Sequence, residues 1–227
     1  MTHEAIVVSW SSGKDSALAV HELRAARRRV VGLVTTMNGN NARVAMHGVR
    51  QGLLRQQADA LGLPLHQVPL PDPCTDDDYR RCFAERLRAL RQIGVTTIAY
   101  GDIFLADVRA YREDLTGQTG LAVEFPLWGR PTEELAWRMV RLGLRSTLVA
   151  VDTSRCPPEL LGTDFADALP HLSRCCDPCG ENGEFHTFAH AGPMFRSPVE
   201  FQTGITIQRG VMRFLDLVEQ APRQVSP

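Results

Sequence analysis

The stretch Ala5-Ile6-Val7-Val8-Ser9-Trp10-Ser11-Ser12-Gly13-Lys14-Asp15-Ser16 decides the fold. Its apolar start predicts a buried strand over 6–9, and the amphipathic run 17–28 predicts a helix. A strand, a loop of small residues and a helix in this order form an anion site, because the first free N–H groups of the helix and the positive end of its dipole point at one place. The stretch therefore predicts a binding site for a phosphate-bearing ligand.

Each residue type in the loop suits phosphate binding. Ser11, Ser12 and Gly13 have little or no side chain, so a phosphate can approach the backbone closely. Lys14 adds a full positive charge, and Asp15 in the first helical turn suits capping of N–H groups or binding of a metal ion. The alternative is an ordinary helix start whose side chains only cap and solvate. The candidate nucleotide-binding residues of this loop are Ser9, Ser11, Ser12, Gly13, Lys14, Asp15 and Ser16.

Strand-like and helical runs alternate along the first two thirds of the chain. The expected strands are 6–9, 30–36, 65–70, 96–100, 122–125 and 147–151, and the expected helices are 17–28, 48–61, 76–93, 108–116 and 131–142. This alternation predicts an α/β fold with right-handed βαβ units and a Rossmann-like parallel sheet covered by helices on both faces.

The alternation of strand-like and helical runs ends after residue 152. A helical segment over 155–171 and a turn-rich stretch over 175–188 are followed by alternating patterns in 200–208 and 211–217, which predict an antiparallel pair or edge strands. We expect a nucleotide-binding domain over 1–152 and a smaller α+β substrate-binding part over 153–227. Ligands of open α/β sheets lie at the carboxyl ends of the strands, so the cleft between the two parts is the expected substrate site.

Composition narrows the class of protein. The 227 residues are 44% hydrophobic and 22% charged, with a formal net charge of −1, which argues against broad electrostatic binding of nucleic acid. No apolar run approaches the roughly twenty residues of a membrane span, and no charged-then-apolar leader precedes Ala5. We expect a cytoplasmic protein with reduced cysteines that binds no membrane, with a homodimer as one option.

Polar residues beyond the loop extend the candidate site. His47, at a predicted helix start after the polar loop 38–47, is a candidate to point into the cleft. Gly101 and Asp102 end a buried strand, where Gly admits a ligand and Asp suits a ribose hydroxyl, an amine or a metal. Arg109 and Arg112 lie three apart on the next helix, so they suit phosphate or carboxylate, or pair with neighbouring acids.

The turn Glu181-Asn182-Gly183-Glu184 separates two carboxylates by an Asn-Gly dipeptide that favours a tight turn. Such a turn is suited to aim both acids at one place, where they would bind ammonium or a metal or act as a general base. The motif Cys176-x-x-Cys179, with Cys175 adjacent, suits zinc, a redox disulfide or plain reduced thiols, and a single pair leaves all three open.

The loop resembles the pyrophosphate loop S-G-G-K-D-S of the ATP pyrophosphatases, with Ser12 where that family has its first glycine. Taken together, several segments resemble the diphthine–ammonia ligase-type ATP-binding proteins of the adenine nucleotide alpha hydrolase superfamily, and Asp102 with Arg112 resembles the bacterial branch. The segments that carry this resemblance are 9–16, 47–49, 101–103, 126–128 and 180–187.

The resemblance implies an ATP-dependent amide-forming ligase that uses Mg²⁺. It would adenylate a carboxylate of a small molecule or protein, release pyrophosphate and transfer ammonia. Lys14 and the backbone amides of 11–15 would hold the leaving pyrophosphate, Asp15 would hold Mg²⁺, and Glu181 and Glu184 would orient or deprotonate ammonium. Two alternatives remain at this point: a tRNA-thiolating enzyme with Cys176 or Cys179 as sulfur carrier, and a sensor that binds adenine nucleotide without turnover.

Overall fold

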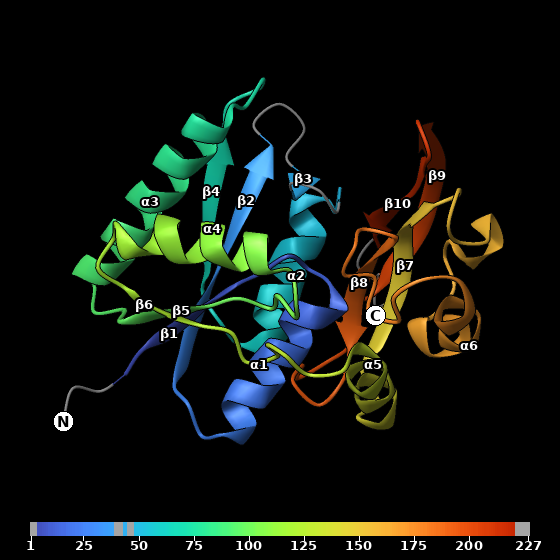
Figure 1. Ribbon diagram of the computed structural model, residues 1–227, viewed down its shortest axis with the longest axis horizontal. Helices are drawn as coiled ribbons and strands as arrows, with labels where there is room; N and C mark the ends of the chain where they lie inside the picture. Colours follow the sequence, from blue (N-terminus) through green and yellow to red (C-terminus); the bar gives the residue numbers. More distant parts are fainter. Residues whose placement is uncertain (1–3, 39–42, 45–47, 221–227) are drawn as a thin grey trace, which may run out of the picture.

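The structure is a computed structural model that describes residues 4–38, 43–44 and 48–220. It contains two sheets that lie side by side (Figure 1): one has six strands, and the other has four. No helix in these residues combines the length and apolarity needed to cross a bilayer.

The first sheet confirms the predicted α/β class. Its parallel strands lie in the order β4-β2-β1-β5-β6, and β3 pairs antiparallel with the end of β2. The strands are β1 (Ile6–Ser9), β2 (Val30–Asn38), β3 (Arg43–Val44), β4 (Leu65–Leu70), β5 (Thr97–Ala99) and β6 (Ala122–Glu124). Helices connect consecutive parallel strands, as expected for βαβ units.

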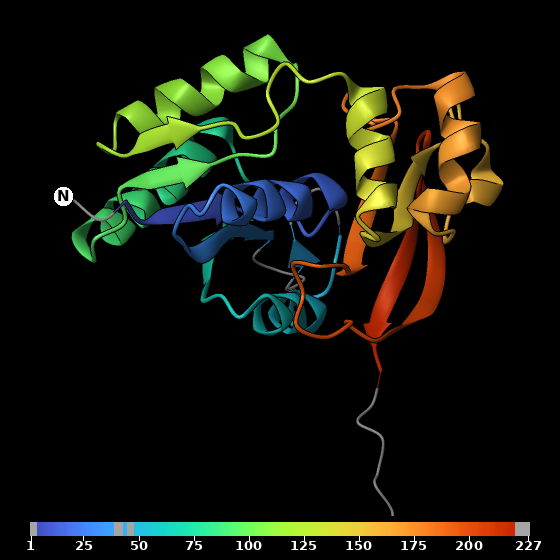
Figure 2. The ribbon, with the colours of Figure 1, turned by 90° about the horizontal axis from the view of Figure 1, so that it is seen from below.

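Helices cover both faces of this sheet (Figure 2), with α4 (light green) on one side and α2 (teal) on the other. The helices are α1 (Lys14–Ala25), α2 (Gln51–Leu61), α3 (Asp76–Gln92) and α4 (Ala106–Gly117). Side chains alternate along β1: Ile6 and Val8 pack with α1 and α2, while Val7 packs with α3 and α4. The continuous apolar run of β1 is thus buried on both faces, which is why it shows no polar alternation.

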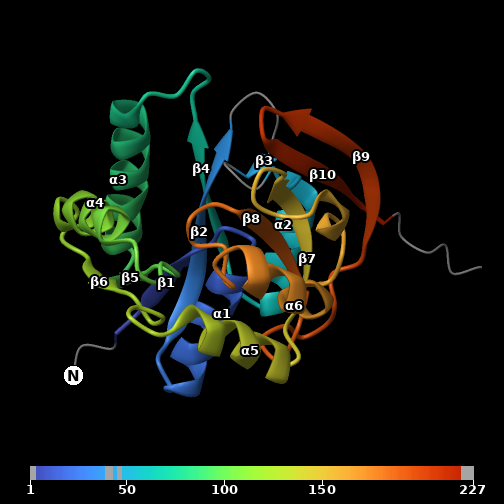
Figure 3. The ribbon, with the colours of Figure 1, turned by 45° about the vertical axis from the view of Figure 1, so that its right-hand side comes forward.

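The second sheet is antiparallel, in the order β8-β7-β10-β9. The elements of this part are α5 (Thr132–Arg141), β7 (Arg145–Asp152), a short 3-10 turn (Pro158–Leu160), α6 (Phe165–Cys175), β8 (Phe185–Ala191), β9 (Phe201–Arg209) and β10 (Met212–Glu219). The antiparallel pair predicted at the C-terminal end is confirmed by β9 and β10. Figure 3 shows α5 and α6 side by side on this part.

The expectation that 147–151 forms a sixth parallel strand is wrong. These residues belong to β7, which pairs antiparallel with β8 and β10. The six residues Ser146–Val151 are all buried, so their apolar run reads the same in either kind of sheet. The parallel sheet therefore ends with β6, and β7 belongs with the C-terminal strands.

The two sheets share one hydrophobic core. A single cluster of buried side chains runs from Ile6 and Val8 of β1, through α1 and α2, to Leu148 of β7 and Phe188 of β8. The antiparallel sheet thus packs against the helix that begins at Lys14. This packing brings the loop before β8 next to the loop that follows β1.

Candidate functional site

A pocket of about 230 Å³ lies where three segments meet: the loop after β1, the end of β5 and the loop before β8. The carboxyl ends of the parallel strands form one wall, which is the expected position of a ligand site in an open α/β sheet. The predicted site residues that line the pocket are Ser9, Ser11, Lys14, Asp15, Ser16, Gly101, Asp102 and Glu181.

Other predicted residues are not brought into the pocket. Ser12, Gly13 and Glu184 are absent from its lining, and His47 lies outside the described residues. Sequence reasoning did not assign Tyr100, Phe185 and Thr187, which do line it. Phe185 and Thr187 belong to the segment 180–187 that carries the resemblance, and Tyr100 directly precedes the segment 101–103, but no role had been given to any of the three.

Ser12 adopts a left-handed backbone conformation with φ of +74°, which favours glycine. Its side chain is fully buried, and its hydroxyl has no hydrogen-bond partner. The hydroxyl therefore faces the protein interior and does not contribute to the pocket. The same position carries glycine in the S-G-G-K-D-S loop, and the backbone angle gives the physical reason.

The side chain of Gln57 in α2 stabilises the loop after β1 through hydrogen bonds, and this residue was not predicted from the sequence. Its Nε2 donates to Ser12 O at 3.0 Å and to Ala189 O at 2.6 Å, while its Oε1 accepts from Trp10 Nε1 at 2.9 Å. The Gln57 side chain is fully buried. The available signal was a glutamine on the apolar face of a helix, where a buried amide needs partners.

The amides of the first helical turn divide into two groups. Gly13 N donates to Ser11 Oγ at 3.3 Å, and Lys14 N donates to Thr187 Oγ1 at 3.0 Å. The amides of Asp15 and Ser16 precede the first intrahelical bond, which Ala17 N donates to Gly13 O. The expectation that all amides of 11–15 face the ligand is therefore too broad, and those of Asp15 and Ser16 are the ones placed for an anion.

Lys14 is buried, with 2% of its surface exposed. Its Nζ lies 2.9 Å from Asp15 Oδ2 and 5.0 Å from the centre of the Phe185 ring, and it donates to Cys179 O. Burial opposes the charge, but the attraction of Asp15 and other neighbouring groups outweighs it and raises the pKa of Lys14. The pocket therefore contains a permanent ammonium group.

Asp15 also has a free carboxylate oxygen. Its Oδ2 pairs with Lys14, whereas its Oδ1 is buried without a hydrogen-bond partner. An unpartnered buried carboxylate oxygen on the pocket wall is a suitable ligand for a hard cation such as Mg²⁺. The residues present thus fit the magnesium ion that the resemblance implies.

Glu181 joins the loop before β8 to the end of the parallel sheet. Its Oε1 accepts from Ile103 N at 2.7 Å and from Phe104 N at 3.4 Å. Burial is the largest influence on this carboxyl and raises its pKa to about 7, against these two hydrogen bonds. A carboxyl with this pKa exchanges its proton near neutral pH.

Glu184 does not share the pocket with Glu181. Its Oε1 accepts from Asp177 N at 3.3 Å and from Asn182 Nδ2 at 3.1 Å. Glu184 directly precedes β8 and is 3% exposed, and it is absent from the pocket lining although its neighbours Gly183 and Phe185 belong to it. The turn therefore does not aim its two acids at one place.

Of the two arginines singled out on α4, Arg109 and Arg112, only Arg112 lines the pocket. Arg112 lines the pocket, with Nε 3.9 Å from Asp102 Oδ2 and the guanidinium 5.0 Å from the centre of the Tyr100 ring. Its Nε is buried without a hydrogen-bond partner, and burial raises the pKa of Asp102. Arg109 is absent from the pocket lining, and its guanidinium lies 4.6 Å from the centre of the Trp128 ring.

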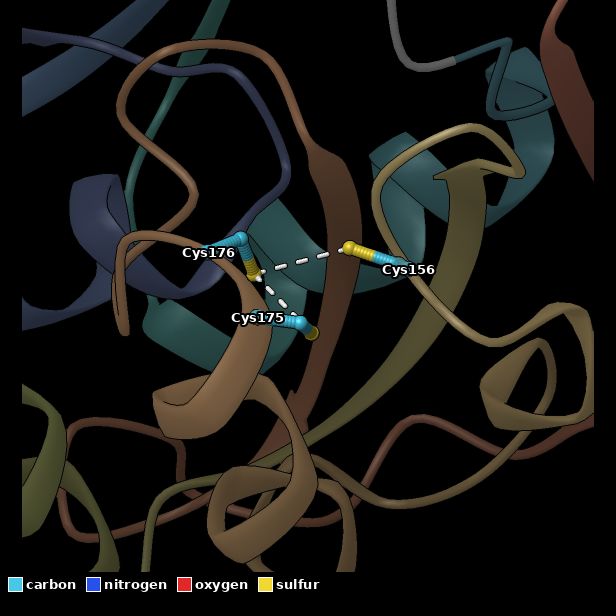
Figure 4. A group of neighbouring side chains, drawn as sticks. All are labelled: Cys156, Cys175 and Cys176. Carbon is cyan, nitrogen blue, oxygen red and sulfur yellow. Dashed lines mark hydrogen bonds between the residues drawn. The ribbon is translucent and has the colours of Figure 1, made fainter.

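The predicted cysteine pair does not form one site. Cys179 lines the pocket, where its Sγ donates to Thr132 O at 3.3 Å. Cys176 lies instead with Cys175 and with Cys156, which follows β7 and was not singled out from the sequence (Figure 4). No spacing motif links Cys156 to the other two, because the fold alone brings them together.

Comparisons with known proteins find a matching family and several similar proteins. The family described as diphthamide synthase N-terminal domain matches residues 4–123. A diphthine–ammonia ligase from Bos taurus is 23% identical over 212 residues, covering 83% of this chain and 79% of the relative. Its namesake from Danio rerio is 23% identical over 217 residues, covering 83% of each chain.

A solved structure, described as a predicted subunit of tRNA methyltransferase from Methanocaldococcus jannaschii, is 17% identical with a TM-score of 0.44 and covers 86% of this chain and 100% of its own. The family match is the stronger finding, since it spans more than half of the 227 residues and includes the whole loop from Ser9 to Ser16. The chain therefore belongs to the diphthamide synthase N-terminal domain family.

Proposed function

We propose that the protein is an ATP-dependent carbon–nitrogen ligase, which joins ammonia to a substrate carboxylate and releases AMP and pyrophosphate. The observation that carries the proposal is the convergence of Lys14, Arg112 and Glu181 on one pocket beside a helix N-terminus. Membership of the family and the similarity to proteins named diphthine–ammonia ligase support the same reaction class.

The loop supplies the groups that would bind the phosphates of ATP. Lys14 contributes the ammonium, Asp15 and Ser16 contribute amides at the positive end of the α1 dipole, and the hydroxyls of Ser9 and Ser11 line the same wall. Asp15 Oδ1 would hold a magnesium ion, which when bound neutralises phosphate charge.

In the first step, a carboxylate oxygen of the substrate attacks the α-phosphorus of ATP, and the bond to pyrophosphate breaks. The charge that develops on the leaving group is stabilised by Lys14 and by the free amides of the first turn. Arg112 Nε, buried and without a hydrogen-bond partner, is suited to orient the attacking carboxylate or the phosphate.

In the second step, ammonia attacks the acyl carbon, the bond to AMP breaks and an amide forms. Ammonium must lose a proton before it attacks, and we assign its removal to Glu181, because burial raises the pKa of this carboxyl to about 7. We assign Glu184 a supporting role, since its carboxylate bonds to the turn that carries Glu181.

The thiolation alternative has less support. Sulfur transfer needs a thiolate, and burial raises the pKa of Cys179 well above its usual range. Cys176 lies outside the pocket, so the two cysteines are not placed to exchange sulfur across one substrate.

The test compares Lys14→Met with Arg29→Met, a control that removes an exposed charge just beyond α1. Pyrophosphate release is measured with ATP, ammonium and a panel of carboxylates, and nucleotide binding is measured by calorimetry. We expect Lys14→Met to lose at least about 100-fold in turnover, the usual effect of removing one charge-stabilising group, and the control to keep it. Nucleotide binding without pyrophosphate release in the unmodified protein would favour a sensor, and unchanged turnover in Lys14→Met would refute the assignment.

A further inference from the structure

Three cysteine thiols gather in the C-terminal part (Figure 4), and none of them lines the pocket. Cys176 Sγ lies 3.5 Å from Cys156 Sγ and 4.0 Å from Cys175 Sγ, and all three sulfur atoms lie within 4.8 Å of one another. Cys156 lies in the loop after β7, Cys175 is the last residue of α6, and Cys176 follows it. The cluster thus joins two segments that are distant in the sequence.

The separations of the three sulfur atoms match those of a thiolate metal site. Thiolates about 2.3 Å from a tetrahedral zinc ion lie about 3.8 Å from one another, between the two separations observed here. We propose that Cys156, Cys175 and Cys176 bind a soft metal ion, with Zn²⁺ the preferred occupant for thiolate ligands.

The surroundings of the cluster favour a cation. Cys156 Sγ lies 3.8 Å from Glu184 O, and Oε2 of the same glutamate is buried without a hydrogen-bond partner. The negative charge of Glu184 acts on Cys156, and it would attract a cation bound at the cluster. Arg155 Nη1 lies 3.7 Å from Glu184 Oε1 and offsets part of the charge of this carboxylate.

The cluster also has a rigid base and an open side. Cys156 is 3% exposed, and its amide donates to Asp152 O at 2.8 Å in the turn after β7. Cys175 is exposed, so a metal ion has a path of entry and a solvent molecule can occupy a fourth position. A bound ion would fix the start of the segment that leads from Cys176 to Glu181, and binding to the native state alone would raise stability.

The test uses the full untagged chain, reduced and freed of metal, with Co²⁺ as a spectroscopic probe and Zn²⁺ in competition with a chromophoric chelator. We expect a thiolate-to-cobalt charge-transfer band and a rise in melting temperature on addition of Zn²⁺. Cys156→Ser should weaken zinc binding at least about 100-fold, since even changes next to metal ligands cost about 10- to 100-fold.

The matched control is the Cys74→Ser, Cys82→Ser double variant, which removes two thiols outside the cluster and should retain the band. Cys175→Ser changes an exposed side chain, so it keeps the test decisive if Cys156→Ser fails to fold. A cobalt spectrum without a thiolate band would overturn the proposal, and so would equal zinc affinity in the cluster variants and the control. If Cys156 and Cys176 are found as a disulfide, failure to bind metal after its reduction would also overturn the proposal.

Discussion

The half-buried carboxyl of Glu181 makes a sharp prediction about the pH dependence of stability. Burial raises its pKa from 4.5 to about 7 in the folded chain, whereas the unfolded chain has an ordinary value. At about 1.4 kcal/mol per unit, the shift corresponds to about 3 kcal/mol. Solvent screening at a half-buried site reduces the expected effect to about 1–2 kcal/mol.

The sign follows from which state holds the proton. Below pH 4.5 both states are protonated, and the contribution of Glu181 is fully present. Between pH 4.5 and about 7 the unfolded chain has lost the proton while the folded chain retains it, so stability falls as the pH rises. Above that range both states are ionised, and the contribution is constant.

The assay is urea unfolding of the unmodified protein and of Glu181→Gln at a series of pH values. Between pH 4.5 and pH 7.5 the unmodified protein should lose about 1–2 kcal/mol of unfolding free energy relative to Glu181→Gln. The m-values should stay unchanged. Glu4→Gln is the control: the hydrogen bond from Arg28 lowers the pKa of Glu4, so its difference should stay flat in this range. A flat difference for Glu181→Gln, or one of opposite sign, would refute the reasoning.

Three further substitutions test the loop. Gln57→Leu breaks three buried hydrogen bonds and should lower the free energy of unfolding in urea by about 3 kcal/mol. The control Gln56→Leu on the same helix should change it by no more than about 0.5 kcal/mol. Equal losses in the two variants would show that Gln57 does not stabilise the loop. Ser12→Gly should gain about 1 kcal/mol in the same assay, because relief of a left-handed residue and an unpartnered hydroxyl exceeds the added chain entropy; a loss would show that the backbone there is unstrained. Gly101→Ala places a Cβ 3.2 Å from the backbone of Asp15 and Ser16 in the first turn of α1 and should lower kcat/KM for ATP about 10-fold, while Gly117→Ala, with nothing within 4 Å, should not.

The parts of the fold that the sequence predicted are those with strong local signals. The predicted bounds of β1 at 6–9 and β4 at 65–70 agree with the structure, because each is a short run with strand-like residues bounded by turn residues. The sequence of a single strand does not tell whether the strand pairs in parallel or antiparallel. The strand β7 has the same buried pattern as a parallel strand, and only its pairing with β8 and β10 shows that it is antiparallel.

The candidate site shows the same division. The loop residues Lys14 and Asp15 were predicted to lie together because one helix turn places them. Glu181 lines the pocket and Glu184 does not, and this difference depends on how the turn before β8 folds, which no residue pattern fixed. Cys156 and Cys176 lie 20 residues apart without a spacing motif, so only the packing of α6 on β7 brings their thiols together.

The burial of Lys14 has a practical consequence for chemical probing. Lys14 is the only lysine in the 227-residue sequence, and 2% of it is exposed. Acylating reagents selective for side-chain amines therefore have one target, enclosed by Phe185 and Cys179. The rate at which such a reagent labels Lys14 therefore reports how often the pocket opens. A molecule that occupies the pocket should lower this labelling rate.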